Sequence, residues 1–416
     1  MKDNQSVSSL PKVGFSAPVS AGRSIAGVYV HFPWCLAKCP YCDFVSYAAD
    51  RAAIDHAGYA DAVLREIDAR AEAIGRRKVG SIFFGGGTPS LWEPHELGRV
   101  LRHIRERFPC TPDLEITVEC NPTSLDRERA DALRAVGVDR LSIGTQSLRT
   151  EQLRFLGRLH DPDGARNAIR DAFASGVPRI STDMIFGLPD QTPEDARDQA
   201  IALAELGLTH LSCYQLTIEP GTQFGELAKR GRLPLADDGH TADAFLAIDD
   251  ALSARGFRHY EISNYAHRGE ESRHNLGYWR GDEYIGVGCA AFGCVQTGSN
   301  VERVRYRNAI DPRRYVEATR SMRRDVVGEG DGVSMFSETI DGAALLREKI
   351  MLGLRTEEGV DLETSALALG VEAWPRDRKR AADRLVSMDR LTVDGGHLSI
   401  PRKAWLFTDD AAARLF

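Results

Sequence analysis

A chain of 416 residues, 43% of them hydrophobic, can form one large domain and a smaller one, each with a core. Its net charge of -7 provides no basic surface excess, which excludes nucleic acid as the main partner. It contains no run of about 18 apolar residues, so it is not expected to span a membrane, and any membrane contact is expected to be peripheral.

The N-terminal segment 1–24 is rich in Ser, Pro and Lys and is predicted to be a disordered tail. It has neither the apolar centre of a secretory leader nor an Arg-rich amphipathic pattern. Without a leader, the eight cysteines are expected to stay reduced. The sequence therefore predicts a cytoplasmic protein with free thiols.

From residue 25 onward, short β-rich runs alternate with longer helical patterns, which is typical of repeated βα units around a parallel sheet. Strands are predicted at 25–31, 81–84, 114–119, 140–143, 180–185 and 210–216, with helices at 59–73, 94–108 and 127–135 between them. We expect an α/β fold with a partial (β/α)6 barrel over 25–230 and a barrel-completing region over 231–327. Ligands of such a barrel bind at the carboxyl ends of the strands.

Three cysteines follow the first predicted strand with the spacing C-x3-C-x2-C: Cys35, Cys39 and Cys42. Three thiolates in one short loop can bind three irons of a 4Fe-4S cluster and leave the fourth iron without a protein ligand. Two alternatives are a Cys3His zinc site that includes His31 and a chance cluster of buried thiols.

Polar residues also follow the later strands. The second is followed by Gly85, Gly86, Gly87 and Thr88, whose backbone can approach a ligand closely and whose carbonyls can accept from an ammonium group. The carboxylates Glu119 and Asp183 are candidates for binding ribose hydroxyls or a cation. Gln146 and Arg158 are candidates for binding a carboxylate.

Further along, the segment 273–280 contains a second candidate site. His274 is a candidate axial ligand of haem iron, assisted by Asn275 and Tyr278, and the rings of Tyr278 and Trp279 provide flat apolar surface. The alternative is that His274 and Asn275 only hydrogen-bond a loop that closes the barrel.

The C-terminal part has its own pattern. A glycine-rich linker is predicted at 328–332, followed by helices at 343–354 and 375–388 and a hairpin with its turn at Asp394-Gly395. These elements predict a winged-helix-like α+β domain over 333–416. Its nearly balanced charge favours protein docking or a structural lid over DNA binding.

Together these motifs resemble the oxygen-independent coproporphyrinogen III oxidase group of radical S-adenosylmethionine (SAM) proteins, and within it the haem-chaperone branch called HemW. The resemblance runs from about residue 26 to the end. It depends on the segments 29–44, 85–90, 119–122, 183–191 and 260–266, and on Gln146 and Arg158. It implies a 4Fe-4S cluster, SAM and haem as cofactors. It also implies SAM contacts by Tyr29, Tyr41, Gly86, Gly87, Thr88, Glu119, Gln146, Arg158 and Asp183, and leaves open whether one or two SAM molecules bind.

Two departures from the oxidase pattern distinguish this chain from the oxidase branch of the group. The oxidases carry a fourth cysteine two residues after the third, where this chain has Asp43 and then Phe44, and they have a longer N-terminal extension. In contrast, His274, Asn275 and Tyr278 fit the H-N-x-x-Y pattern of HemW, which implies that they bind haem. The resemblance thus implies a haem chaperone that delivers haem to respiratory haemoproteins, with the oxidase as the alternative. It leaves open reductive SAM cleavage and homodimerisation.

Overall fold

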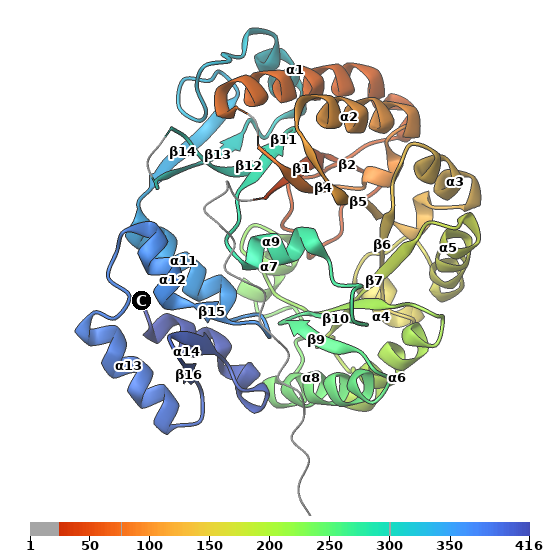
Figure 1. Cartoon of the computed structure of the whole chain (residues 1–416). Helices are drawn as coiled ribbons and strands as arrows, with labels where there is room; N and C mark the ends of the chain where they lie inside the picture. Colours follow the sequence, from red (N-terminus) through yellow and green to blue (C-terminus); the bar gives the residue numbers. More distant parts are fainter. Residues whose placement is uncertain (1–24, 76, 299–300) are drawn as a thin grey trace, which may run out of the picture.

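The computed structural model describes residues 25–75, 77–298 and 301–416 (Figure 1). The predicted tail 1–24 lies outside the described residues. Within the described ranges, no helix is both long enough and apolar enough to cross a membrane.

Six parallel strands form the centre of a twelve-stranded sheet, and each lies beside the next in chain order. They are β1 (Ala26–Phe32), β4 (Val79–Gly86), β5 (Cys110–Cys120), β6 (Arg140–Gln146), β7 (Arg179–Phe186) and β8 (His210–Gln215). Each overlaps one of the six predicted strands. The partial barrel is therefore confirmed, because the period-2 and apolar patterns of these strands were strong enough to identify them.

The helices that follow the strands cover the outside of the curved sheet (Figure 1). They are α1 (His56–Ile74), α2 (Pro94–Arg107), α3 (Arg127–Ala135), α5 (Pro162–Ser175), α6 (Pro193–Ala204) and α8 (Asp238–Ser253). Asp or Thr side chains cap most of them. Asp126, for example, accepts from the Arg129 amide at 2.8 Å. The main core lies between this layer and the sheet, where Val30, Ile82 and Leu141 are fully buried.

The sheet continues beyond both sides of the six parallel strands. Strand β11 (Tyr284–Val287) pairs parallel with β1 and leads into the antiparallel strands β12 (Phe292–Gln296), β13 (Arg303–Asn308) and β14 (Ser334–Ile340). On the other side, β10 (Asn264–Ala266) and β9 (Arg258–Glu261) extend from β8. The short helix α9 (Arg273–Trp279) lies inside the ring of strands (Figure 1).

The remaining elements are short. Near the start of the chain, β2 (Trp34–Cys35) pairs with β3 (Tyr47–Ala48), and α4 (Thr150–Phe155), α7 (Gln223–Lys229) and α10 (Pro312–Ala318) lie in connections between the longer elements. Cys289 and Cys294 are buried in the β11–β12 region.

A second core belongs to the C-terminal domain. It is built from the helices α11 (Gly342–Gly353), α12 (Leu362–Leu369), α13 (Arg376–Ser387) and α14 (Thr408–Arg414), and from a three-stranded sheet of β15 (Val360–Asp361), β17 (His397–Ser399) and β16 (Thr392–Asp394). Leu346, Leu385 and Leu398 are buried at its centre. The predicted helices and hairpin are present, as a winged-helix-like α+β domain requires.

The predicted linker at 328–332 and the domain boundary at residue 333 are wrong. Strand β14 is paired with β13 and so belongs to the large sheet, and the second core begins in α11. Within the supposed linker, Asp331 is fully buried and accepts from Arg70 Nη1 of α1 at 2.6 Å. This ion pair fixes the glycine-rich segment against the barrel, because a buried carboxylate needs a charged partner.

Candidate functional site

The cysteine loop is held at the carboxyl end of β1 by backbone hydrogen bonds. The Gly87 amide donates to Phe32 O and the Thr88 amide to Trp34 O, both at 2.8 Å. A Cβ at residue 87 would lie 2.6 Å from Trp34 O, so this close approach requires glycine. Beyond this contact the loop carries Cys35, Cys39 and Cys42 as free, partly exposed thiols.

His31 is not available as a zinc ligand, which argues against the Cys3His alternative. Its Nε2 bonds Val45 O at 2.9 Å and its Nδ1 bonds the Tyr29 hydroxyl at 3.0 Å. Because Nε2 must donate to the carbonyl, Nδ1 accepts from Tyr29. Burial lowers the pKa of His31 to about 4, so it stays neutral. His31 therefore ties the end of the cysteine loop to β1. In the described ranges, no three His, Cys, Asp or Glu side chains are arranged to hold a single metal ion.

Arg158 connects the cysteine loop to the end of β6. Its Nη1 donates to Cys39 Sγ at 3.5 Å and its Nη2 to Gly144 O at 2.8 Å. Its Nε is buried and has no hydrogen-bond partner among the described residues. Beside it, Gln146 has a φ of +67°, a left-handed conformation that is uncommon for a non-glycine residue and often occurs at functional sites.

Two carboxyl groups, one on β5 and one on β7, line the barrel interior near this mouth. Glu119 Oε2 accepts from the Gly86 amide at 3.1 Å, and Asp183 accepts from the Ser142 hydroxyl at 3.3 Å. Burial, and then the neighbouring charge of Asp183, raise the pKa of Glu119 to about 8. Burial also raises the pKa of Asp183. These carboxyl groups are therefore costly to ionise until a ligand with hydroxyl or positively charged groups joins them.

The other residues expected to contact SAM lie around the same mouth. Tyr41 packs against the small cluster of Leu156, Ile185 and Leu188, and Thr88 is buried behind the cysteine loop. Tyr29 points inward from β1 and stacks on Phe83, with 6.3 Å between ring centroids. Thiols for iron, an unpaired guanidinium nitrogen for a carboxylate and acidic groups for hydroxyls thus converge, and this donor set fits a cluster with bound SAM.

A polar cavity of about 150 Å³ lies inside the barrel below this mouth. The strands supply Tyr29, Phe83, Thr117, Glu119, Arg140, Ser142, Ser181, Asp183, His210, Ser212 and Tyr214, and residues near or within α9 supply Ser272, His274, Asn275 and Tyr278. We call it the central cavity. It places the expected SAM carboxylates and the H-N-x-x-Y residues around one space.

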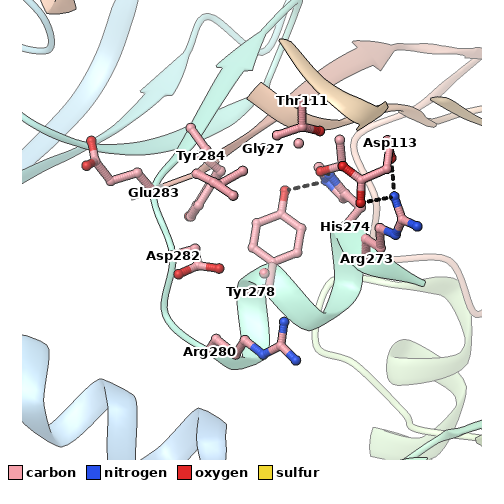
Figure 2. Close-up of a pocket in the computed structure, with 15 residues that line it drawn as sticks. Gly27, Thr111, Asp113, Arg273, His274, Tyr278, Arg280, Asp282, Glu283 and Tyr284 are labelled. Atoms are coloured by element: carbon pink, nitrogen blue, oxygen red, sulfur yellow. Dashed lines mark hydrogen bonds and ion pairs between the residues drawn. The ribbon is translucent and has the colours of Figure 1, made fainter. Parts of the chain in front are cut away.

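A second cavity, of about 190 Å³, opens at the amino ends of β1, β4 and β5 and is called the amino-end cavity. Figure 2 shows Tyr278 at its centre with the hydroxyl directed at His274, and Arg273 paired with Asp113 at its edge. His274 and Tyr278 line both cavities and so form the partition between them.

His274 is held firmly within this partition. Its Nδ1 lies 2.9 Å from Ser81 Oγ, its Nε2 lies 3.3 Å from the Tyr278 hydroxyl, and its ring stacks on Phe83 at 4.8 Å. Burial lowers its pKa to about 3, so the imidazole is neutral. The structure thus brings His274 and Tyr278 together and places Asn275 beside them. It places His274 and Tyr278 between the central cavity and the amino-end cavity, and Asn275 on the wall of the central cavity.

Several residues of the central cavity were not singled out from the sequence. Arg140 and His210 begin β6 and β8, where charged and polar residues are ordinarily exposed strand ends, yet only 2% and 3% of their surface is accessible. The usable signal was the alternation Arg140, Ser142, Gly144 along β6, which directs polar and small side chains to one face. An inward polar face indicates a filled or ligand-binding barrel interior.

Comparisons with known proteins agree with this geometry. A family model described as the Radical SAM superfamily matches residues 29–211, and one described as the HemN C-terminal domain matches residues 340–407. The chain is 39% identical over 300 residues to the heme chaperone HemW of Escherichia coli, covering 71% of this chain and 78% of the relative. It is 33% identical to the heme chaperone HemW of Mycobacterium tuberculosis, covering 89% and 91%.

A mitochondrial relative and one solved structure extend the comparison. The radical S-adenosyl methionine domain-containing protein 1 of Danio rerio is 34% identical, covering 80% of this chain and 74% of the relative. The structure of coproporphyrinogen III oxidase (HemN) from Escherichia coli superposes with a TM-score of 0.76 over 94% of this chain and 90% of that one. At 20% identity this match shows a shared fold.

Proposed function

The chain belongs to the HemW family of the radical SAM superfamily, and from this membership and the site geometry we propose that it is a haem-binding chaperone. The observation that carries the proposal is the cysteine loop. It has three free thiols, and its residue 44 is a phenylalanine with 59% of its surface exposed. An oxidase-type loop would have a cysteine at that position. The protein would act in the cytoplasm and deliver haem to respiratory haemoproteins.

In this proposal Cys35, Cys39 and Cys42 bind a 4Fe-4S cluster, and the residues around the mouth bind SAM. When bound, this pair supplies one-electron chemistry at the carboxyl end of the barrel. Arg158 Nε, which has no partner among the described residues, would bind the SAM carboxylate, and carbonyls of the glycine turn at 85–87 would accept from its ammonium group. Glu119 and Asp183 would accept from ribose hydroxyls, which offsets the cost of ionising them in a buried site.

Haem would bind at the other end, with His274 as the axial ligand and Asn275 and Tyr278 assisting. A neutral imidazole is what such a ligand requires, and burial keeps His274 neutral. However, an iron at Nε2 must displace the Tyr278 hydroxyl, and the amino-end cavity of about 190 Å³ is smaller than pockets that enclose drug-sized ligands, about 300–1,000 Å³. Haem binding therefore requires α9 to move, or the macrocycle to lie partly outside the barrel.

The second candidate is oxygen-independent coproporphyrinogen III oxidase activity. It is favoured by the completeness of the SAM-binding set, because Tyr29, Glu119, Gln146, Arg158 and Asp183 all lie at the carboxyl-end mouth or line the cavity beneath it. Holding haem alone would not demand so complete a set.

One anaerobic experiment separates the two functions. The protein with a reconstituted cluster is titrated with haem while the Soret band is recorded, and is separately incubated with SAM, a reductant and coproporphyrinogen III. A saturable Soret shift near one haem per chain without decarboxylation would support the chaperone. Conversion to protoporphyrinogen would show that the protein is an oxidase and that residue 44 does not distinguish chaperones from oxidases.

A further inference from the structure

The base of the central cavity contains three buried polar atoms that lack hydrogen-bond partners among the described residues. They are Thr117 Oγ1, Arg140 Nη2 and His210 Nδ1, on side chains that are at most 3% exposed. All three residues line the cavity. Buried polar groups are almost always satisfied in folded proteins, so three such atoms around one space indicate that a polar ligand completes them.

The three groups come from neighbouring positions of the sheet. Thr117 and Arg140 are register partners on β5 and β6, and His210 is the partner of Ser181 on the β7 side of β8. Both Arg140 and His210 line the central cavity. Burial and then the charge of Arg140 hold the pKa of His210 well below its ordinary value, so the imidazole is neutral.

The hydrogen bonds around His210 indicate which nitrogen carries its proton. The Tyr260 hydroxyl accepts from the Ser272 amide at 3.2 Å and lies 2.8 Å from His210 Nε2. In the arrangement that uses the tyrosine proton, Tyr260 donates to Nε2, so Nδ1 carries the hydrogen and faces the cavity as a donor. Arg140 Nη2 is a donor as well, and the Thr117 hydroxyl can donate.

The charge of Arg140 is only partly balanced. Its Nη1 donates to Glu270 O at 3.1 Å and lies 3.6 Å from Glu115 Oε2, an oxygen that is closer to Arg179, at 3.0 Å. The other carboxyl groups of the cavity, Glu119 and Asp183, lie toward the opposite mouth and have raised pKa values because they are buried. The base of the cavity is therefore rich in donors and partly positive.

We propose that the base of the central cavity is a carboxylate-binding site, in which Arg140 Nη2, His210 Nδ1 and Thr117 Oγ1 hold the two oxygens. At about 150 Å³ the cavity is smaller than pockets that enclose drug-sized ligands, about 300–1,000 Å³, so its occupant is a small acid or one acidic arm of a larger ligand. A propionate side chain of a tetrapyrrole is such an arm. The site itself does not depend on the haem proposal.

The test uses the full chain with its cluster reconstituted, and titrates propionate and its uncharged isostere propionamide by NMR or calorimetry. The wild type is expected to bind propionate saturably and propionamide at least tenfold more weakly. Arg140→Gln is expected to weaken propionate binding by about tenfold or more, and Thr117→Val by about fivefold, since charged hydrogen bonds contribute more than neutral ones.

Thr182→Val is the matched control. Thr182 is also a fully buried strand threonine, but its hydroxyl contacts Thr145 and Ile143 O away from the cavity, so propionate binding is expected to stay unchanged. If Arg140→Gln does not fold, as judged by circular dichroism and cluster absorption, Thr117→Val against Thr182→Val decides the matter. Equal binding of propionate and propionamide by the wild type, or no propionate binding, would overturn the proposal and indicate a cavity that holds only water.

A second arm distinguishes the source of the carboxylate. Haem and its dimethyl ester, which lacks free carboxylates, are titrated with the wild type and with Arg140→Gln. A preference for haem that disappears in the variant would identify a tetrapyrrole side chain as the occupant. Equal haem and ester affinities together with specific propionate binding would identify a free small acid. Failure of haem to bind at all would count against the chaperone function. The propionate titrations alone would then test the carboxylate-binding site.

Discussion

Replacing Glu119 by glutamine is expected to stabilise the protein that lacks cluster and SAM, although it removes a group proposed to bind SAM. Folded Glu119 keeps its proton up to a pKa of about 8, whereas the unfolded chain releases it near 4.5. Unfolding therefore releases a proton between these values, and stability falls as the pH rises from about 4.5 to about 8. The glutamine can keep the hydrogen bond from the Gly86 amide.

The magnitude follows from the pKa difference. At about 1.4 kcal/mol per pKa unit, the ionisation penalty reaches about 3 kcal/mol at pH 7 and about 5 kcal/mol above pH 8 as upper limits. Because the residue as a whole is only half-buried, these limits are reduced, and we expect Glu119→Gln to gain about 1–3 kcal/mol at pH 7.5. The variant should also lose most of the pH dependence between pH 5 and 8.

The assay is denaturant or thermal unfolding of the apo-protein between pH 5 and 9, followed by a probe of the barrel. Glu115→Gln is the control, because Glu115 is buried on the same strand but lies 3.0 Å from Arg179 and accepts from the His274 amide at 3.1 Å. That variant should lose about 3–5 kcal/mol, since it removes the carboxylate beside the buried Arg140 and leaves Arg179 with Asp139 alone. A destabilised Glu119→Gln with the pH slope of the wild type would show that folded Glu119 is ionised and stabilising, and would refute the reasoning.

Three further predictions concern other parts of the chain. Cys35→Ala, Cys39→Ala or Cys42→Ala should each abolish the charge-transfer absorption of the reconstituted cluster, whereas Cys110→Ala should leave it intact; a cluster that survives one of the three losses would indicate another ligand. His274→Ala should weaken haem binding in a Soret titration and leave the cluster spectrum unchanged; unaltered haem affinity would remove His274 from the haem site. Arg70→Met should lower the free energy of unfolding by about 3–5 kcal/mol, because it leaves Glu66 and Asp331 buried without their cation; a neutral result in urea denaturation would show that these carboxyl groups are protonated in the fold.

The parts of the fold that could be predicted from sequence are those with local patterns. The six parallel strands and the helices between them have strong periodicity, and Cys35, Cys39 and Cys42 have a spacing that identifies their chemistry. The supposed linker at 328–332 was mispredicted because glycines are its only local signal. Its actual state depends on Asp331 meeting Arg70, which is far away in sequence.

In the candidate site, too, the features with a local sequence pattern could be predicted, and those that depend on contacts between distant residues could not. Glu119 and Gln146 could be named in advance because they lie at or just after the ends of predicted strands, and Asp183 because it is a carboxylate within one. The hydrogen-bond partners of the two His274 ring nitrogens could not be predicted from the sequence. One of them, Ser81, lies on a strand that is far away in the chain. Arg140 and His210 were missed for a related reason, since burial at the base of a barrel is a property of the closed sheet.

The position of His274 has a consequence for how the two ends of the barrel communicate. His274 and Tyr278 separate the central cavity from the amino-end cavity, and the His274 amide is held by Glu115, which also pairs with Arg179 and lies near Arg140. A ligand that takes His274 away from Tyr278 must therefore disturb a helix whose backbone is bonded to the charged base of the central cavity. If haem binds at His274, it should in turn alter the binding of carboxylates at Arg140, because a coupling between two sites acts equally in both directions.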